Sequence, residues 1–188
     1  MGLKKTKSIT HQGKRVSEIL AAHELFFSGK PGGARADLSG ADLSGADLGS
    51  ANLSGAILRG ANLEGADLRR AQLSSADLSG ANLRNADLRN SDLTEASLAG
   101  ANLEQAQASG IEFFRCDLSH ANFKRALLRN TNFRLANVRG AQFSGADMGV
   151  AILRETDLTG ADLSGVDLST TLLPRDYAPA AKAEGKSA

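Results

Sequence analysis

Apolar residues recur every five positions from Ala36 to Arg175, without a break in frame. Leu, Phe, Met or Val occupies every fifth position from Leu38 to Leu173, except at Ala108, and we call these residues centres. A small residue, usually alanine, stands two positions before each centre. A period of five fits neither an α-helix nor a strand, which repeat every 3.6 and every two residues. Such fixed self-similarity predicts a solenoid, whose units bury their apolar sides only by stacking on one another.

The remaining three positions of each repeat are mostly polar or glycine, and we expect them to face outward. Asp or Asn precedes most centres, and pairs such as Ser39-Gly40 and Ser44-Gly45 follow them. Glycine in the second position after a centre suits a chain that turns a corner at every repeat. The centre and the small residue would therefore fill the interior.

Tandem units of the form Ala-Asp-Leu-Ser-Gly, Ala-Asn-Leu-Ser-Gly and Ala-Asn-Leu-Glu-Gly resemble the pentapeptide-repeat family over residues 36–175. The resemblance implies an all-β solenoid, a right-handed quadrilateral parallel β-helix with four pentapeptides per coil. Residues 20 apart would then stack, and the 28 repeats would form about seven coils. On this register Phe113 stacks with Phe133 on one side, and Phe123 stacks with Phe143 on the opposite side.

The residues outside the repeats predict three further segments. Apolar residues recur at helical spacing from Val16 to about Phe27, before a glycine- and proline-rich stretch that ends the pattern. We expect this helix to cover the open first coil, whose unpaired edge would otherwise invite association. The predicted divisions are a basic disordered arm, a capping helix with its linker, the β-helix and a disordered tail: 1–15, 16–35, 36–175 and 176–188.

Charge and cysteine content place few further constraints on function. Lys and Arg number 22 and Asp and Glu number 21, so the net charge is only +1. The lone Cys116 occupies an inward small-residue position, where we expect a buried structural thiol, and one cysteine permits no disulfide within the chain. No apolar run reaches 18 residues and no secretory leader is recognised, so we expect no membrane span. These features favour a cytoplasmic location, and the family resemblance favours a bacterial one.

No catalytic constellation emerges from the sequence. The many aspartates recur in one slot as the period demands, which indicates a solvated, hydrogen-bonding stripe. His11, His23 and His120 are scattered and make no metal-ligand spacing with Cys116. We therefore expect neither an enzyme nor a bound metal or cofactor.

One outward stretch departs from the polar rule. On the side that carries Phe113 and Phe133, apolar residues and arginines occupy slots that are polar elsewhere. Aromatic and arginine side chains on a rigid surface are typical of protein contacts. The candidate partner-binding residues are Phe114, Arg115, Arg134, Leu135, Ile152 and Arg154.

Three hypotheses about function follow from these observations, and the first is favoured. It is a non-enzymatic scaffold that binds an unidentified protein partner through the flat faces of a rigid rod. The second is gyrase protection by DNA mimicry, known for the quinolone-resistance members of the family, but mimicry requires continuous negative potential. The third is nucleic-acid binding, which is disfavoured because the six cations of residues 113–143 spread over all sides. The apolar residues after the last repeat either fold over the final coil or form a homodimer through it.

Overall fold

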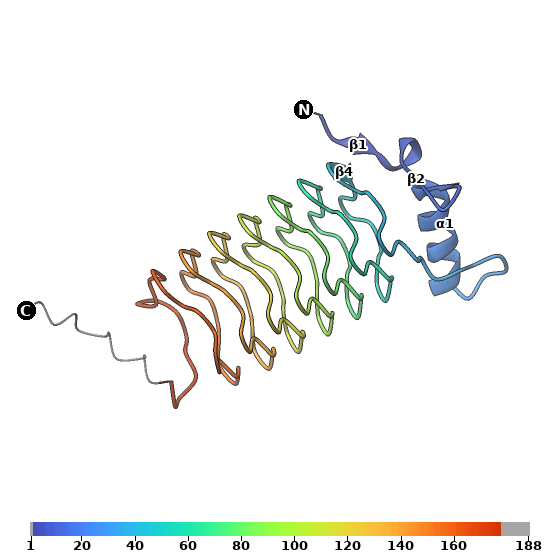
Figure 1. Cartoon of the computed structure of the whole chain (residues 1–188). Coiled ribbons are helices and arrows are strands. Elements are labelled where there is room, and N and C mark those ends of the chain that lie inside the picture. The colour runs from blue at the N-terminus through green and yellow to red at the C-terminus, as the bar shows by residue number, and fades with distance from the viewer. Residues whose placement is uncertain (1, 178–188) are drawn as a thin grey trace, which may run out of the picture.

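The protein is an elongated rod of stacked coils with an N-terminal segment at one end (Figure 1). The computed structural model describes residues 2–177. Parallel β-bridges join residues 20 apart along the repeats, from Asp37 with Ile57 to Ile152 with Leu172. One coil therefore takes 20 residues and contains four five-residue segments, as the resemblance implied. We number these segments sides 1 to 4 by the centres of the first coil, which are Leu38, Leu43, Leu48 and Leu53.

The interior consists of the centres and the small residues that precede them. Every centre from Leu38 to Leu153 is at most 1% exposed, and these include Leu78 and Leu98. Burial of one such leucine side chain stabilises the fold by about 2 kcal/mol. The assignment of inward and outward positions is confirmed for this part of the chain.

Most of the Asp and Asn residues that precede centres stabilise the turn that follows. Their side-chain oxygens accept hydrogen bonds from the backbone N–H two residues later, at 3.0 Å from Asp37 to Ser39 and 3.1 Å from Asn52 to Ser54. This local bond satisfies a backbone donor that the sheet does not use, and it favours the turn conformation. The stripe of aspartates therefore has a structural cause that requires no ligand.

Aromatic centres form two stacks in the second half of the rod, as predicted. The rings of Phe113 and Phe133 are 5.1 Å apart and 24° from parallel. Those of Phe123 and Phe143 are 5.0 Å apart and 7° from parallel. Phe113 meets Phe123 edge-on at 5.7 Å across the interior, so the two stacks fill one continuous core.

Residues 2–15 have definite structure, in contrast to the disordered arm that the sequence predicted. β1 (Lys4–Lys5) runs parallel to β4 (Ala46–Asp47), and Lys4 opposes Ala46 in this pair. The backbone N–H of Lys4 donates to the carbonyl of Gly45 at 2.8 Å, and the segment therefore extends side 3 by one strand. From the sequence alone, Lys4 and Lys5 were expected to be solvated, because the residues that pair with them lie more than forty positions away in the chain. The elements are β1 Lys4–Lys5, η1 Thr6–Ser8, β2 Thr10–His11, β3 Lys14–Arg15, α1 Val16–Phe27 and β4 Ala46–Asp47.

Helix α1 has the predicted bounds, but less of it is buried than its apolar pattern suggested. Only Val16 and His23 are fully buried within it, whereas Phe26 and Phe27 are half-exposed. The Nδ1 atom of His23 accepts a hydrogen bond from the backbone N–H of Ala36 at 3.1 Å. This bond ties the helix to the first residue of the repeats.

The interior is more open at the C-terminal end of the rod. The centres Leu158, Leu163 and Leu173 are only partly buried, unlike all those before them. The backbone N–H of Tyr177 donates to the carbonyl of Pro174 at 3.2 Å, just beyond the last repeat. Most of the predicted tail, residues 178–188, lies outside the described residues.

Candidate functional site

The six predicted contact residues lie on side 4 and on the turn that follows it. They come from three successive coils, because residues 20 apart stack. The backbone N–H of Arg115 donates to the carbonyl of Arg134 at 3.1 Å, and that of Phe133 donates to the carbonyl of Ile152 at 2.8 Å. These ladder bonds hold the outward side chains on a rigid backbone. We call this set the Phe114 surface: Phe114, Arg115, Arg134, Leu135, Ile152 and Arg154.

Charges on the Phe114 surface are largely balanced by neighbouring acids. The Arg115 guanidinium lies 5.1 Å from the centre of the Phe114 ring and 3.5 Å from the Glu95 carboxylate. Arg134 lies 3.1 Å from the carboxylate of Glu155. Such exposed pairs add little stability and can be exchanged for pairs with a partner. The surface therefore combines apolar side chains with charges of both signs rather than forming a basic patch.

Two further apolar residues extend this surface, and sequence reasoning missed both as members. Leu172 pairs with Ile152 through a β-bridge on side 4, and Val150 occupies the turn that leads into this side. Leu135, Val150 and Leu172 are between 42% and 49% exposed. The signal was present in the sequence, because Leu172 fills a slot that is usually Asp or Asn, and Val150 fills a slot that is often glycine.

The ionisable groups of the described residues do not converge on a reaction centre. Among residues 2–177, no three His, Cys, Asp or Glu side chains are placed to hold a metal ion. The Cys116 thiol is buried and donates to the carbonyl of Leu93 at 2.7 Å. Burial raises the pKa of this thiol to about 12, so it stays protonated at neutral pH. In the same part of the chain, no helix has the length and apolar character needed to cross a membrane.

Comparison with protein families identifies the repeats. The sequence matches the family model described as pentapeptide repeats, in eight copies, over residues 36–71, 71–107, 111–149 and 151–173. The chain is a pentapeptide-repeat protein. The known pentapeptide-repeat structures are right-handed quadrilateral β-helices, which agrees with the stacking at intervals of 20 residues. A comparison with curated protein sequences gave no match.

Several solved pentapeptide-repeat structures resemble this chain. HetL, from the cyanobacterium Nostoc sp. strain PCC 7120 and involved in heterocyst differentiation regulation, is 31% identical, with 76% of this chain and 86% of HetL covered and a TM-score of 0.32. A thylakoid-lumen protein of Arabidopsis thaliana is 34% identical, with coverage of 60% and 68% and a TM-score of 0.29. QnrB1, a plasmid-mediated fluoroquinolone resistance protein, is 20% identical, with coverage of 74% and 78% and a TM-score of 0.48. These likenesses concern the repeat fold and do not identify a shared partner.

Proposed function

We propose that this pentapeptide-repeat protein is a non-enzymatic, cytoplasmic scaffold that binds a protein partner through the Phe114 surface and its extension. The observation that carries the proposal is the presence of two exposed apolar residues in a turn slot that otherwise holds glycine or a polar residue. Leu135 and Val150 have φ of 58° and 60°, in the left-handed region that favours glycine. A non-glycine residue there costs roughly 1–2 kcal/mol. The same cost falls on polar residues such as Ser50 and Asn90 in other repeats, so it belongs to the fold. Leu135 and Val150 differ in being large, apolar and exposed where the other repeats have glycine or a polar residue, and contact with a partner explains this better than stability of the free rod.

The two ends of the rod have separate roles in this proposal. The N-terminal segment caps the first coil, since β1 and His23 both bond to residues of the first repeats. The partly buried centres of the last coil provide an apolar end that a second copy of the chain would cover. Homodimer formation at this end would leave the Phe114 surface free on each protomer, because that surface faces sideways from the rod.

DNA mimicry is not supported by the charges along side 3. Three successive aspartates form an acidic row there, but each has a basic neighbour. The pairs are Asp47 with Lys5 at 2.6 Å, Asp67 with Arg69 at 2.6 Å and Asp87 with Arg89 at 2.6 Å. A mimic of duplex DNA needs uncompensated negative charge along the rod.

The proposal is tested by comparing partners captured by three versions of the full chain. Leu135→Ser with Ile152→Ser removes two apolar contacts from the Phe114 surface. Leu127→Ser removes an exposed leucine from side 3 and serves as the matched control. The proposal expects a protein that the wild type and the control capture from native lysate to be lost by the double variant. Capture that is equal for all three would exclude this surface as the binding site.

A further inference from the structure

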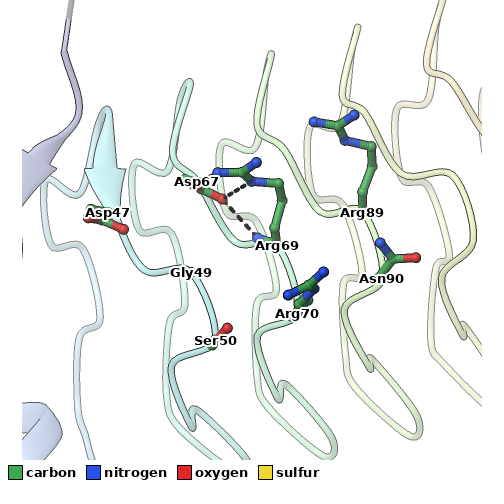
Figure 2. A pocket seen from close by; sticks show the side chains of 8 residues that line it. All are labelled: Asp47, Gly49, Ser50, Asp67, Arg69, Arg70, Arg89 and Asn90. Atoms are coloured by element: carbon green, nitrogen blue, oxygen red, sulfur yellow. Dashed lines mark hydrogen bonds and ion pairs between the residues drawn. The ribbon is translucent and has the colours of Figure 1, made fainter.

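A hollow of about 480 Å³ lies on side 3 near the N-terminal end of the rod (Figure 2). It forms because Gly49 has no side chain where the next two coils carry Arg69 and Arg89 in the same slot. The hollow opens to solvent, and every lining residue except Gly49 has a polar or charged side chain. The lining residues are Asp47, Gly49, Ser50, Asp67, Arg69, Arg70, Arg89 and Asn90.

The carboxylates beside the hollow are already bound by cations. Arg69 donates from Nε and Nη2 to Asp67 at 2.9 and 2.6 Å, and Figure 2 shows the Arg69 side chain lying against this carboxylate. Asp67 is buried, so this bidentate pair is fixed in place. On the other side of the hollow, Lys5 of β1 donates to Asp47 at 2.6 Å. These contacts neutralise the acids and leave the cationic character of the hollow in place.

Arg70 is the uncompensated charge of the hollow. It forms no ion pair within 4.0 Å among residues 2–177, in contrast to Arg69 and Arg89. Its φ of 59° places it in the left-handed turn slot, which projects its exposed side chain outward. Ser50 and Asn90 occupy the same slot in the coils before and after it, and the three side chains form one row in Figure 2. A guanidinium, a hydroxyl and an amide thus line one side of the hollow, and among residues 2–177 the guanidinium of Arg70 has no paired carboxylate.

We propose that this hollow binds the phosphate group of a phosphate monoester, with Arg70 as its principal anchor. A phosphate monoester offers three terminal oxygens and up to two negative charges to the donors of the row, whereas a carboxylate offers two oxygens and one charge. The hydroxyl of Ser50 and the amide of Asn90 would bind further phosphate oxygens. The hollow has no aromatic or large apolar lining, so the rest of the ligand is polar rather than a base that stacks.

The N-terminal segment supports the phosphate site through Lys5. Without Lys5, the carboxylate of Asp47 would face the hollow unpaired and repel a dianion. A Lys5→Gln variant is therefore expected to weaken phosphate binding, although Lys5 itself does not line the hollow. Combining it with Asp47→Asn should restore the affinity, because the repelling charge is then absent.

The test titrates inorganic phosphate and then phosphoserine into the full chain at constant ionic strength, following the arginine Nε–H signals by NMR. Saturable shifts at Arg70 are expected for both, with phosphoserine bound at least as tightly as inorganic phosphate. Arg70→Gln should weaken binding by at least about tenfold, since a charge-assisted contact is lost. The matched control is Arg125→Gln, which changes an exposed arginine of the same turn slot that also lacks an ion pair within residues 2–177.

A second variant tests the shape of the site without changing its charge. Gly49→Gln fills the hollow, and the fold should accept it, because an added Cβ would meet no atom closer than 3.7 Å and the backbone is not left-handed. Phosphate affinity should fall as for Arg70→Gln, with an unchanged melting temperature. The proposal is overturned if the wild type shows no saturable shift, if it binds inorganic phosphate but not phosphoserine, or if Arg125→Gln weakens binding as much as Arg70→Gln. These outcomes leave the Phe114 surface untested, because it lies on another side of the rod.

Discussion

Truncation of Leu83 to alanine tests the division between the interior and the surface. Leu83 is fully buried on side 2, between Leu63 and Leu103 of the adjacent coils, and its backbone N–H donates to Asn102 at 2.7 Å. The lost burial amounts to roughly 1.5–3 kcal/mol. The truncation also leaves a cavity that the stacked coils on either side cannot easily fill. We therefore expect the free energy of unfolding to fall by about 3–5 kcal/mol in total. That is a large part of the 5–15 kcal/mol typical of whole domains.

Leu127→Ala is the matched control for this experiment. Leu127 is a leucine of the outward slot before a centre and is 46% exposed, so the same truncation should cost about 1 kcal/mol. The free energy of unfolding is measured by urea denaturation followed by circular dichroism, with comparison of midpoints and slopes. If the two variants lose the same stability, the inside-outside assignment is refuted. A broadened transition in Leu83→Ala alone would instead indicate that coils on either side unfold separately.

Three further predictions concern His23, Cys116 and gyrase. Burial lowers the pKa of His23, so the unfolded chain binds its proton more readily, and the unfolding free energy should fall as pH drops below about 6.5. The melting temperature of His23→Gln should lack this step between pH 7.5 and 5.5, and an identical step in the variant would contradict the assignment. Cys116 should react with a thiol reagent only as fast as the chain unfolds, and rapid labelling of the native protein would show that the site is open. An equimolar amount of the protein should not protect gyrase from a quinolone in a supercoiling assay, whereas clear protection would support mimicry.

The interior of the rod could be predicted from the sequence because its spacing is fixed. One side chain in five must be large and apolar, so the position of Leu98 or the contact between Phe113 and Phe133 follows from counting. The number of residues per coil came from the family resemblance, since the period alone permits coils of other sizes.

The ends and the outer surface were harder to predict, because they depend on contacts between distant residues. Lys4 and Lys5 have the composition of a solvated arm, but the open edge of the first coil offers them a strand partner. Phe26 and Phe27 follow the helical spacing of the buried positions, yet only Val16 and His23 of α1 are fully buried, and Ile19 and Leu20 pack against the core while partly buried. The hollow exists because Gly49 lacks a side chain, and it can be recognised only when the stacking of the neighbouring coils is known.

The strict length of the repeat restricts how this protein can change during evolution. A single residue inserted within a strand segment would turn the adjacent leucine of that coil toward solvent, so the extra residue has to bulge out at a turn and disturb the stacking there. Substitutions in the three outer slots carry no such penalty, and addition or removal of a whole turn preserves the frame. Members of this lineage should therefore differ in length by complete turns and diverge most on their outer slots, where new binding specificities can arise without loss of the core.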